Sequence, residues 1–172
     1  MPVPAVATSD DVATWLHDLD IVPTTTADRD GISVWDLALD GRRRLDLRIT
    51  LILDPATGLI IWLHLAPPLG DGLRKAYRLL LGWNDEFPLA KFSLAEDGRP
   101  ILSVEIPTRW LDADELGLAL ARVVGIADRL FDATRPWVWV GGHVPAGYAT
   151  RERRSDVLLS RYAVRLPELF EA

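Results

Sequence analysis

Three histidines are the side chains in this sequence whose chemistry most readily suggests a metal or catalytic site. His17, His64 and His143 are far apart, and they do not form the His-x-x-x-His or His-Glu-x-x-His spacing of zinc sites. The chain contains no cysteine, which excludes disulfides, thiolate chemistry and cysteine-based zinc sites. The sequence therefore predicts neither a metal site nor a bound cofactor.

Motifs for nucleophilic catalysis or phosphate binding are also missing from the sequence. There is no Gly-x-Ser-x-Gly elbow and no Walker-type loop. The glycine pair before His143 is more typical of a turn than of an oxyanion-binding site. Asp10 and Asp11 lie where a helix is expected to begin, and the helix dipole favours acidic residues there. We therefore expect a protein that is not an enzyme.

Length and charge limit the remaining classes of function. A chain of 172 residues can form one domain with a substantial core, or one domain plus an arm. Its formal net charge of -6 argues against nonspecific nucleic-acid binding. No uncharged apolar run approaches the roughly 20 residues of a membrane span, and no secretory signal is recognisable at the N-terminus. Together with the absence of cysteine, these features lead us to expect a cytoplasmic protein that does not insert into membranes.

The elements that would position any functional residue are clearest between residues 80 and 131. Alternating apolar residues predict strands over residues 90–94 and 101–106, joined by a turn at Asp97-Gly98. Pro107 is expected to end the second strand, because proline cannot donate a hydrogen bond to a neighbouring strand. Asp112 is a suitable N-cap for a long helix, with Glu115 as its capping-box partner. One face of the hairpin and one face of this helix should meet in a core.

The first half of the chain predicts a helix, three strands and a second helix. Ser9 should cap the first helix, and Pro23 with the threonine run 24–26 should end it. Strands are expected over residues 32–39, 45–53 and 59–65, and the second helix is expected from Leu73. The arginine run 42–44 is interpreted as a solvated hairpin tip, with a small anionic site as the alternative.

The second face of the third strand is unusually apolar. It carries Ile60, Trp62 and His64, and we expect Ile52 and Trp35 to lie on the same face of the sheet. Contiguous apolar surface of this kind usually marks an interface or a groove. The face is therefore either covered by the C-terminal arm or the first helix, or it forms a dimer or partner surface.

Residues 133–172 are interpreted as an arm, because they are too few to bury a core of their own. The arm begins with an aromatic stretch that contains Trp137 and Trp139, and the charged run 151–154 is expected to be solvated. Ser155 could cap a short helix through Tyr162. The predicted fold class is α+β in the order α-β-β-β-α-β-β-α, with a mostly antiparallel, five-stranded sheet and helices packed on it.

Several packing and turn motifs carry a family resemblance. They are Leu80-Leu81-Gly82-Trp83-Asn84, Lys91-Phe92-Ser93-Leu94, Asp97-Gly98-Arg99 and Trp110-Leu111-Asp112-Ala113-Asp114-Glu115-Leu116. With the element order, they make residues 9–132 similar to the YbjN family, which shares the type III secretion chaperone-like fold. The resemblance implies a domain over residues 1–132, followed by an arm that packs on this domain or on a dimer mate. It also implies an acidic homodimer that holds an extended segment of a partner on apolar patches.

The resulting hypothesis is a non-catalytic, homodimeric protein-binding or chaperone-like module. The candidate partner-binding residues are Trp35, Trp62, His64, Trp137 and Trp139. One alternative is a small-molecule sensor or an enzyme with a pocket under the C-terminal arm. Another is an arm-exchanged dimer with no free site.

Overall fold

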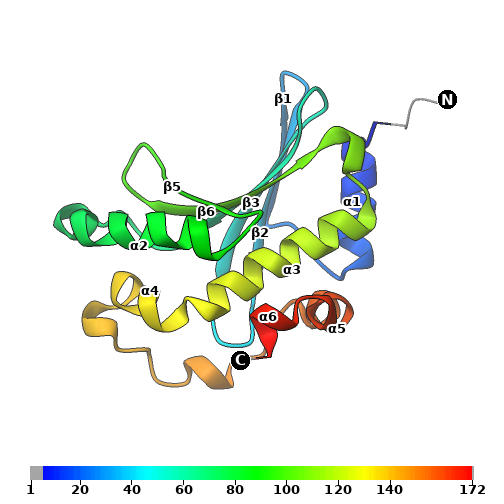
Figure 1. Cartoon of the computed structure of the whole chain (residues 1–172). Coiled ribbons are helices and arrows are strands. Elements are labelled where there is room, and N and C mark those ends of the chain that lie inside the picture. Colours follow the sequence, from blue (N-terminus) through cyan, green and yellow to red (C-terminus); the bar gives the residue numbers. More distant parts are fainter. Residues whose placement is uncertain (1–5, 172) are drawn as a thin grey trace.

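The structure is a computed structural model that describes residues 6–171, in which one antiparallel sheet is packed against helices (Figure 1). The six strands are β1 (Thr25–Arg29), β2 (Ile32–Leu39), β3 (Leu47–Asp54), β4 (Gly58–His64), β5 (Lys91–Leu94) and β6 (Pro100–Pro107). The α-helices are α1 (Ser9–Asp18), α2 (Leu73–Glu86), α3 (Ala113–Arg129), α4 (Phe131–Val138), α5 (Asp156–Tyr162) and α6 (Pro167–Phe170), and five short 3-10 turns separate some of these elements. The predicted α+β class is confirmed.

The sheet has one strand more than the sequence predicted. Its order is β1-β2-β3-β4-β6-β5, and every neighbouring pair is antiparallel. The additional strand, β1, contains two of the threonines that were expected only to end the first helix. All five of its side chains are exposed, so the strand has no apolar alternation that could reveal it.

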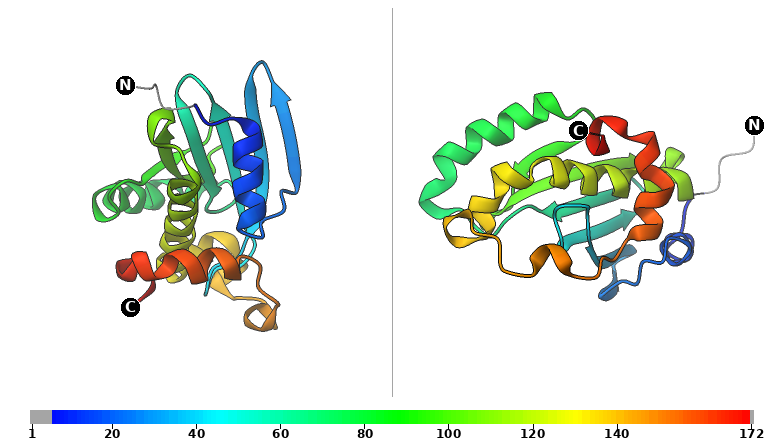
Figure 2. Two further views of the ribbon diagram at one scale, coloured as in Figure 1. Left: turned by 90° about the vertical axis from the view of Figure 1, so that its right-hand side faces the viewer. Right: turned by 90° about the horizontal axis from the view of Figure 1, so that it is seen from below.

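The helices form two further layers on one face of the sheet (Figures 1 and 2). Helix α3 crosses that face, and α5 and α6 pack on the far side of α3. Eleven of the 17 residues of α3 are buried, which is typical of a helix surrounded by protein. A Cβ atom at Gly117 would lie 2.3 Å from the ring of Tyr162. The arm therefore packs tightly on the domain of its own chain.

The face of the sheet toward α3 is the core face. Alternate residues of β2, β3 and β4 are buried there, with the period of two of a half-buried strand. Trp35 is one of them: it pairs with Leu51, is 2 % exposed and belongs to the core. The expectation that Trp35 shares a face with Trp62 is therefore wrong, because Trp35 lies at the opposite phase of the alternation.

Helix boundaries agree with the sequence in part. Asp112 caps α3 as predicted, and its carboxylate accepts from the backbone N–H of Glu115 at 2.8 Å. The N-cap of α1 is Thr8 rather than Ser9, and Thr8 forms a capping box with Asp11. In α2, which begins at Leu73 as predicted, the buried residues are Ala76, Leu80 and Trp83, whereas Tyr77 and Leu81 are exposed.

The arginine run between β2 and β3 is only partly solvated, because the side chains of Arg42 and Arg43 are exposed but the backbone of the run is anchored to α3. The backbone N–H groups of Arg42, Arg43 and Arg44 donate to the buried Asp128 carboxylate at 2.7, 2.9 and 2.8 Å. Arg44 itself is buried, and its guanidinium donates to the carbonyl of Leu65 and the hydroxyl of Thr134. The small anionic site considered for this run is thus occupied by a carboxylate of the chain itself.

The charged run in the arm is also partly engaged. Arg154 donates to both oxygens of the buried Asp40 carboxylate, at 2.9 and 3.0 Å. Burial alone would raise the pKa of Asp40, but the hydrogen bonds from Arg154 and from backbone N–H groups outweigh burial and lower it. Ser155 precedes α5 without capping it, and its hydroxyl instead accepts from the Asp40 N–H. These contacts tie the arm to the loop between β2 and β3.

Candidate protein-binding surface

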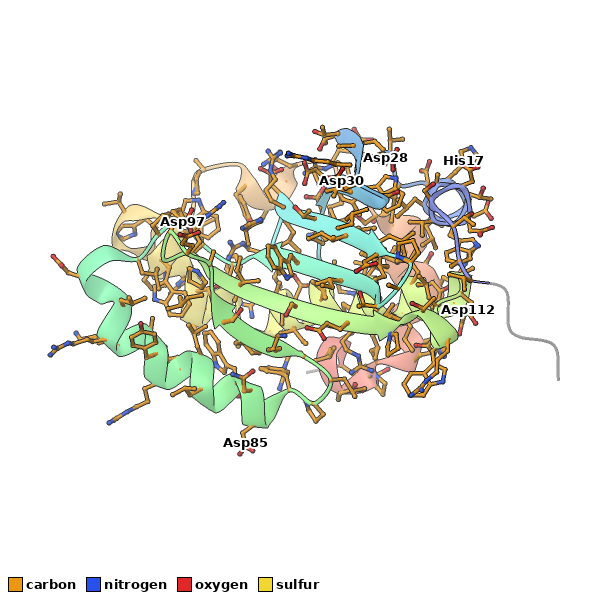
Figure 3. The ribbon with its side chains drawn as sticks, turned by 90° about the horizontal axis from the view of Figure 1, so that it is seen from above. His17, Asp28, Asp30, Asp85, Asp97 and Asp112 are labelled. Carbon is orange, nitrogen blue, oxygen red and sulfur yellow. The ribbon has the colours of Figure 1, made fainter. Side chains whose placement is uncertain are left out.

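The sheet face opposite α3 is not covered by any helix that the structure describes. Figure 3 looks onto this face, with α3 and the arm behind the strands. We call it the outer face and define it by residues that alternate with the core positions: Val34, Asp36, Thr50, Ile52, Ile60, Trp62, His64 and Glu105. Neither the arm nor the first helix covers these residues, so the face remains a candidate interface.

Trp62 is the most exposed large apolar side chain on the outer face, at 40 %. It pairs with Thr50 on one side and Ser103 on the other. One pair further along the strands, Val34, Ile52 and Ile60 form a row across β2, β3 and β4. Trp62 and this row of half-buried, β-branched side chains give the centre of the face an apolar surface.

His64 lies on the outer face next to Ile101 of β6. Its Nδ1 atom is buried and has no hydrogen-bond partner among the described residues. Burial lowers the pKa of His64, and the positive charge of Arg99 lowers it further, against smaller opposing effects of Asp97 and Asp36. Both effects favour the neutral form of His64 in the folded protein.

The lowered pKa of His64 predicts a loss of stability in mild acid. The pKa of His64 in the unfolded chain is about 6.5. Below this pH the unfolded chain binds a proton at His64 more readily than the folded chain does, so the free energy of unfolding decreases as the pH is lowered. Urea denaturation of the wild-type and His64→Leu proteins between pH 5 and 8 measures this effect. The stability of the variant should fall less steeply below pH 6.5. A similar change with His17→Leu, an exposed control, would contradict the assignment.

The five predicted partner-binding residues do not gather in one place. Only Trp62 and His64 share the outer face. Trp137 packs against Trp83, with ring centroids 5.6 Å apart, beside the core. Trp139 contacts Phe131 and Tyr148 at the start of the arm. Trp137 and Trp139 therefore contribute to packing of the arm rather than to the outer face.

A groove that the sequence analysis missed lies at the edge of the sheet, between β6 and α3. Its volume is about 550 Å³. We call it the edge groove; its lining includes Leu89, Lys91, Glu105, Pro107, Trp110, Glu115, Leu118 and Arg122. Trp110 and Leu89 are 59 % and 77 % exposed. The sequence carries no clear signal for it, because the strands expected over residues 90–94 and 101–106 differ in length by only one residue and the groove depends on how α3 passes the sheet edge.

A smaller pocket of about 380 Å³ lies where the alternative hypothesis expected one, under the arm. Arg44, Trp139, Tyr148 and Arg151 are among its lining residues. The guanidinium of Arg44 already donates to Leu65 and Thr134, and the Tyr148 hydroxyl is bound to the backbone of Leu45. Its buried polar groups are thus largely satisfied by the protein.

Two further properties concern the whole described part of the chain. Within residues 6–171, no three histidine or acidic side chains come close enough together to bind a metal ion. None of the helices in the same range is both long and apolar enough to cross a membrane.

The fold and the outer face define an α+β protein with a six-stranded open sheet and one apolar sheet face exposed. The model of the YbjN family, described as "Putative bacterial sensory transduction regulator", matches residues 8–136, about three quarters of the chain. The chain therefore belongs to the YbjN family, which confirms the resemblance seen in its motifs. The match ends within α4, so most of the arm lies outside it. No curated protein matches the sequence.

Proposed function

We propose that this protein is a cytoplasmic, non-catalytic regulatory module that forms a homodimer through the outer face and binds a partner protein by apolar complementarity. The observation that carries this proposal is the exposed Trp62 beside the apolar row of Val34, Ile52 and Ile60, on a face without a covering helix. Membership in the YbjN family, with its description as a "Putative bacterial sensory transduction regulator", supports a regulatory role. The absence of cysteine fits a reducing compartment.

A second copy of the chain is the occupant that best suits the outer face. Two identical sheet faces can pack face to face about 10 Å apart around a two-fold axis, because the same patch then contacts itself. Apolar side chains lie at the centre of the face, and the charged residues Asp36, Arg48 and Glu105 lie around them. A polar rim around an apolar centre is the usual anatomy of a protein interface.

The proposal predicts that Trp62→Glu separates the dimer without unfolding the protein. Replacing a central interface tryptophan typically costs at least about 2 kcal/mol of association, or roughly a 30-fold weaker dimer, and a buried carboxylate adds to this cost. Light scattering gives the mass, and thermal unfolding by circular dichroism reports the fold. We expect a dimeric wild type and a monomeric, folded variant.

Trp110→Glu is the matched control for this experiment. It places the same charge on another exposed tryptophan, away from the outer face, and should leave the dimer intact. A monomeric wild type would refute the homodimer. A Trp62→Glu variant that stays dimeric would refute the outer face as its interface.

A small-molecule sensor with a pocket under the arm is the second candidate, because the pocket of about 380 Å³ is present there. It is the weaker candidate, since the buried polar groups of that pocket already have protein partners. A ligand bound there would raise the thermal stability of the wild type and of the monomeric Trp62→Glu variant alike, because the pocket lies away from the outer face.

A further inference from the structure

The last four residues of β6 have a strand partner on one side only. β6 pairs with β4 from Ile101 to Pro107. On its other side it pairs with β5, and this pairing stops at Ser103. No strand of the described chain continues beside Val104 to Pro107. The short β5 therefore leaves an open stretch of sheet edge, about 13 Å long at 3.3 Å per residue.

Glu105 presents the free backbone groups of this open edge. The carbonyl of Pro100 accepts from Leu65 on the β4 side, whereas the carbonyl of Arg99 accepts from Ala95 on the β5 side. Because both backbone groups of a residue point to the same side of an antiparallel strand and alternate along it, odd-numbered residues of β6 point toward β5. The N–H and C=O of Glu105 and the C=O of Pro107 therefore point into the edge groove. No other backbone group of the described chain is hydrogen-bonded to them there.

The edge groove supplies apolar contacts beside these backbone groups. Trp110 and Leu89, two of the more exposed apolar side chains, belong to its walls. Leu118 and Ala119 of α3 contribute further apolar surface. Leu89 adopts a φ of +64°, which is unfavourable for a leucine and turns the chain away just before β5 begins. The groove thus combines an open strand edge with apolar side-chain sites, as peptide-binding sheet edges do.

The charges of the groove are arranged along its length. Glu115 lies in the first turn of α3, near the end of β6. Arg122 lies two turns later and also lines a neighbouring pocket with Phe87 and Pro88, near the start of β5. A strand that runs antiparallel to β6 would begin beside Glu115 and finish beside Arg122. The charges of Glu115 and Arg122 therefore favour a segment with a basic residue at its N-terminal end and an acidic residue at its C-terminal end.

From this geometry we infer that the edge groove binds a short extended segment of a partner protein, which pairs with Val104–Pro107 of β6 as an added antiparallel strand. Its alternate apolar side chains would contact Trp110, Leu89 and Leu118. A second copy of this chain is a poor occupant, since an edge about 13 Å long is too short for the 1,200–2,000 Å² of a stable interface. The inference deepens the proposed protein-binding function but does not depend on the homodimer.

A defined probe tests the inference on the full chain. It is the fluorescein-labelled heptapeptide Lys-Val-Thr-Leu-Thr-Val-Glu, with apolar residues at alternate positions. We expect fluorescence anisotropy to show binding, and hydrogen exchange to show that the Glu105 amide becomes protected. The same peptide with its two charged ends exchanged should bind more weakly. Peptides with N-methylated backbone at the residues that face β6 should not bind, whereas N-methylation at the outward residues should be tolerated.

Two protein variants separate backbone pairing from side-chain effects. Glu105→Pro removes the free N–H but keeps the pairing with β4, because that N–H points away from β4, and proline is tolerated at sheet edges. We expect at least about tenfold weaker peptide binding. Glu105→Ala is the control, since it removes the ion pair with Lys91 but keeps the N–H, and its affinity should stay within about threefold of wild type.

The outcomes also distinguish this site from the outer face. Trp62→Glu should lower the solution mass of the protein and leave its affinity for the peptide unchanged. Trp110→Ala should weaken peptide binding and leave the solution mass unchanged. Absence of binding by the heptapeptide, or equal binding to wild type and Glu105→Pro, would overturn the inference. A change of mass in Trp110→Ala would assign the groove to a second copy and would overturn it as well.

Discussion

A chain that ends at Asp132 will not fold into the domain described above. The removed arm contributes Leu158, Tyr162, Leu166 and Leu169 to the core, and each of them is at least nine-tenths buried. At about 1.5–3 kcal/mol for each buried side chain, their loss removes roughly 6–12 kcal/mol. The total stability of a domain is only about 5–15 kcal/mol. Circular dichroism of the shortened chain should show no cooperative thermal transition.

Single substitutions in the arm test the same contacts in the full-length protein. Leu158→Ala should lower the free energy of unfolding by about 2–5 kcal/mol, because it leaves a cavity against α3. Val164→Ala is the matched control: Val164 is 74 % exposed, and its replacement should change stability by less than about 0.5 kcal/mol. A cooperative transition in the chain that ends at Asp132 would show that residues 1–132 form an independent domain.

Replacing Asp128 by alanine should be the most damaging substitution of a charged residue. Its carboxylate accepts three backbone hydrogen bonds from the loop between β2 and β3, at 2.7 to 2.9 Å, and the residue is 4 % exposed. Each N–H left without an acceptor costs about 1–3 kcal/mol, so we expect a loss of at least about 3 kcal/mol. Urea denaturation at neutral pH measures this change.

Asp132→Ala provides the control for Asp128→Ala. Asp132 forms an exposed ion pair with Arg43 in the same region, and such pairs contribute at most about 1 kcal/mol. Asp128→Asn should be intermediate, because the amide keeps one acceptor oxygen but turns a donor toward the loop. If Asp128→Ala were no less stable than Asp132→Ala, the three hydrogen bonds would not be important for stability.

Strands and helices whose side chains alternate between core and solvent can be predicted from local sequence. The core face of β3 and β4, the Asp97-Gly98 hairpin and the cap at Asp112 follow from local pattern and turn chemistry. The phase of β2 was not predicted, because Trp35 was expected on the outer face. The exposed position of Trp62 also follows, because it is in antiphase with the core residues of β4. β1 was not predicted, because its side chains are all exposed and show no alternation between apolar and polar residues.

Contacts between distant parts of the chain could not be predicted in this way. The backbone donors that bind Asp128 lie 84 or more residues away along the chain, and Asp40 has a partner 115 residues away. No local pattern encodes such pairs. The sequence shows only that the residue at position 117 of α3 is small, whereas in the structure Gly117 is the surface on which Tyr162 packs. The edge groove likewise depends on where β5 stops beside β6 and on how α3 passes that edge. Local sequence fixes the phase of each element, whereas burial, hydrogen-bond partners and grooves arise from contacts between elements.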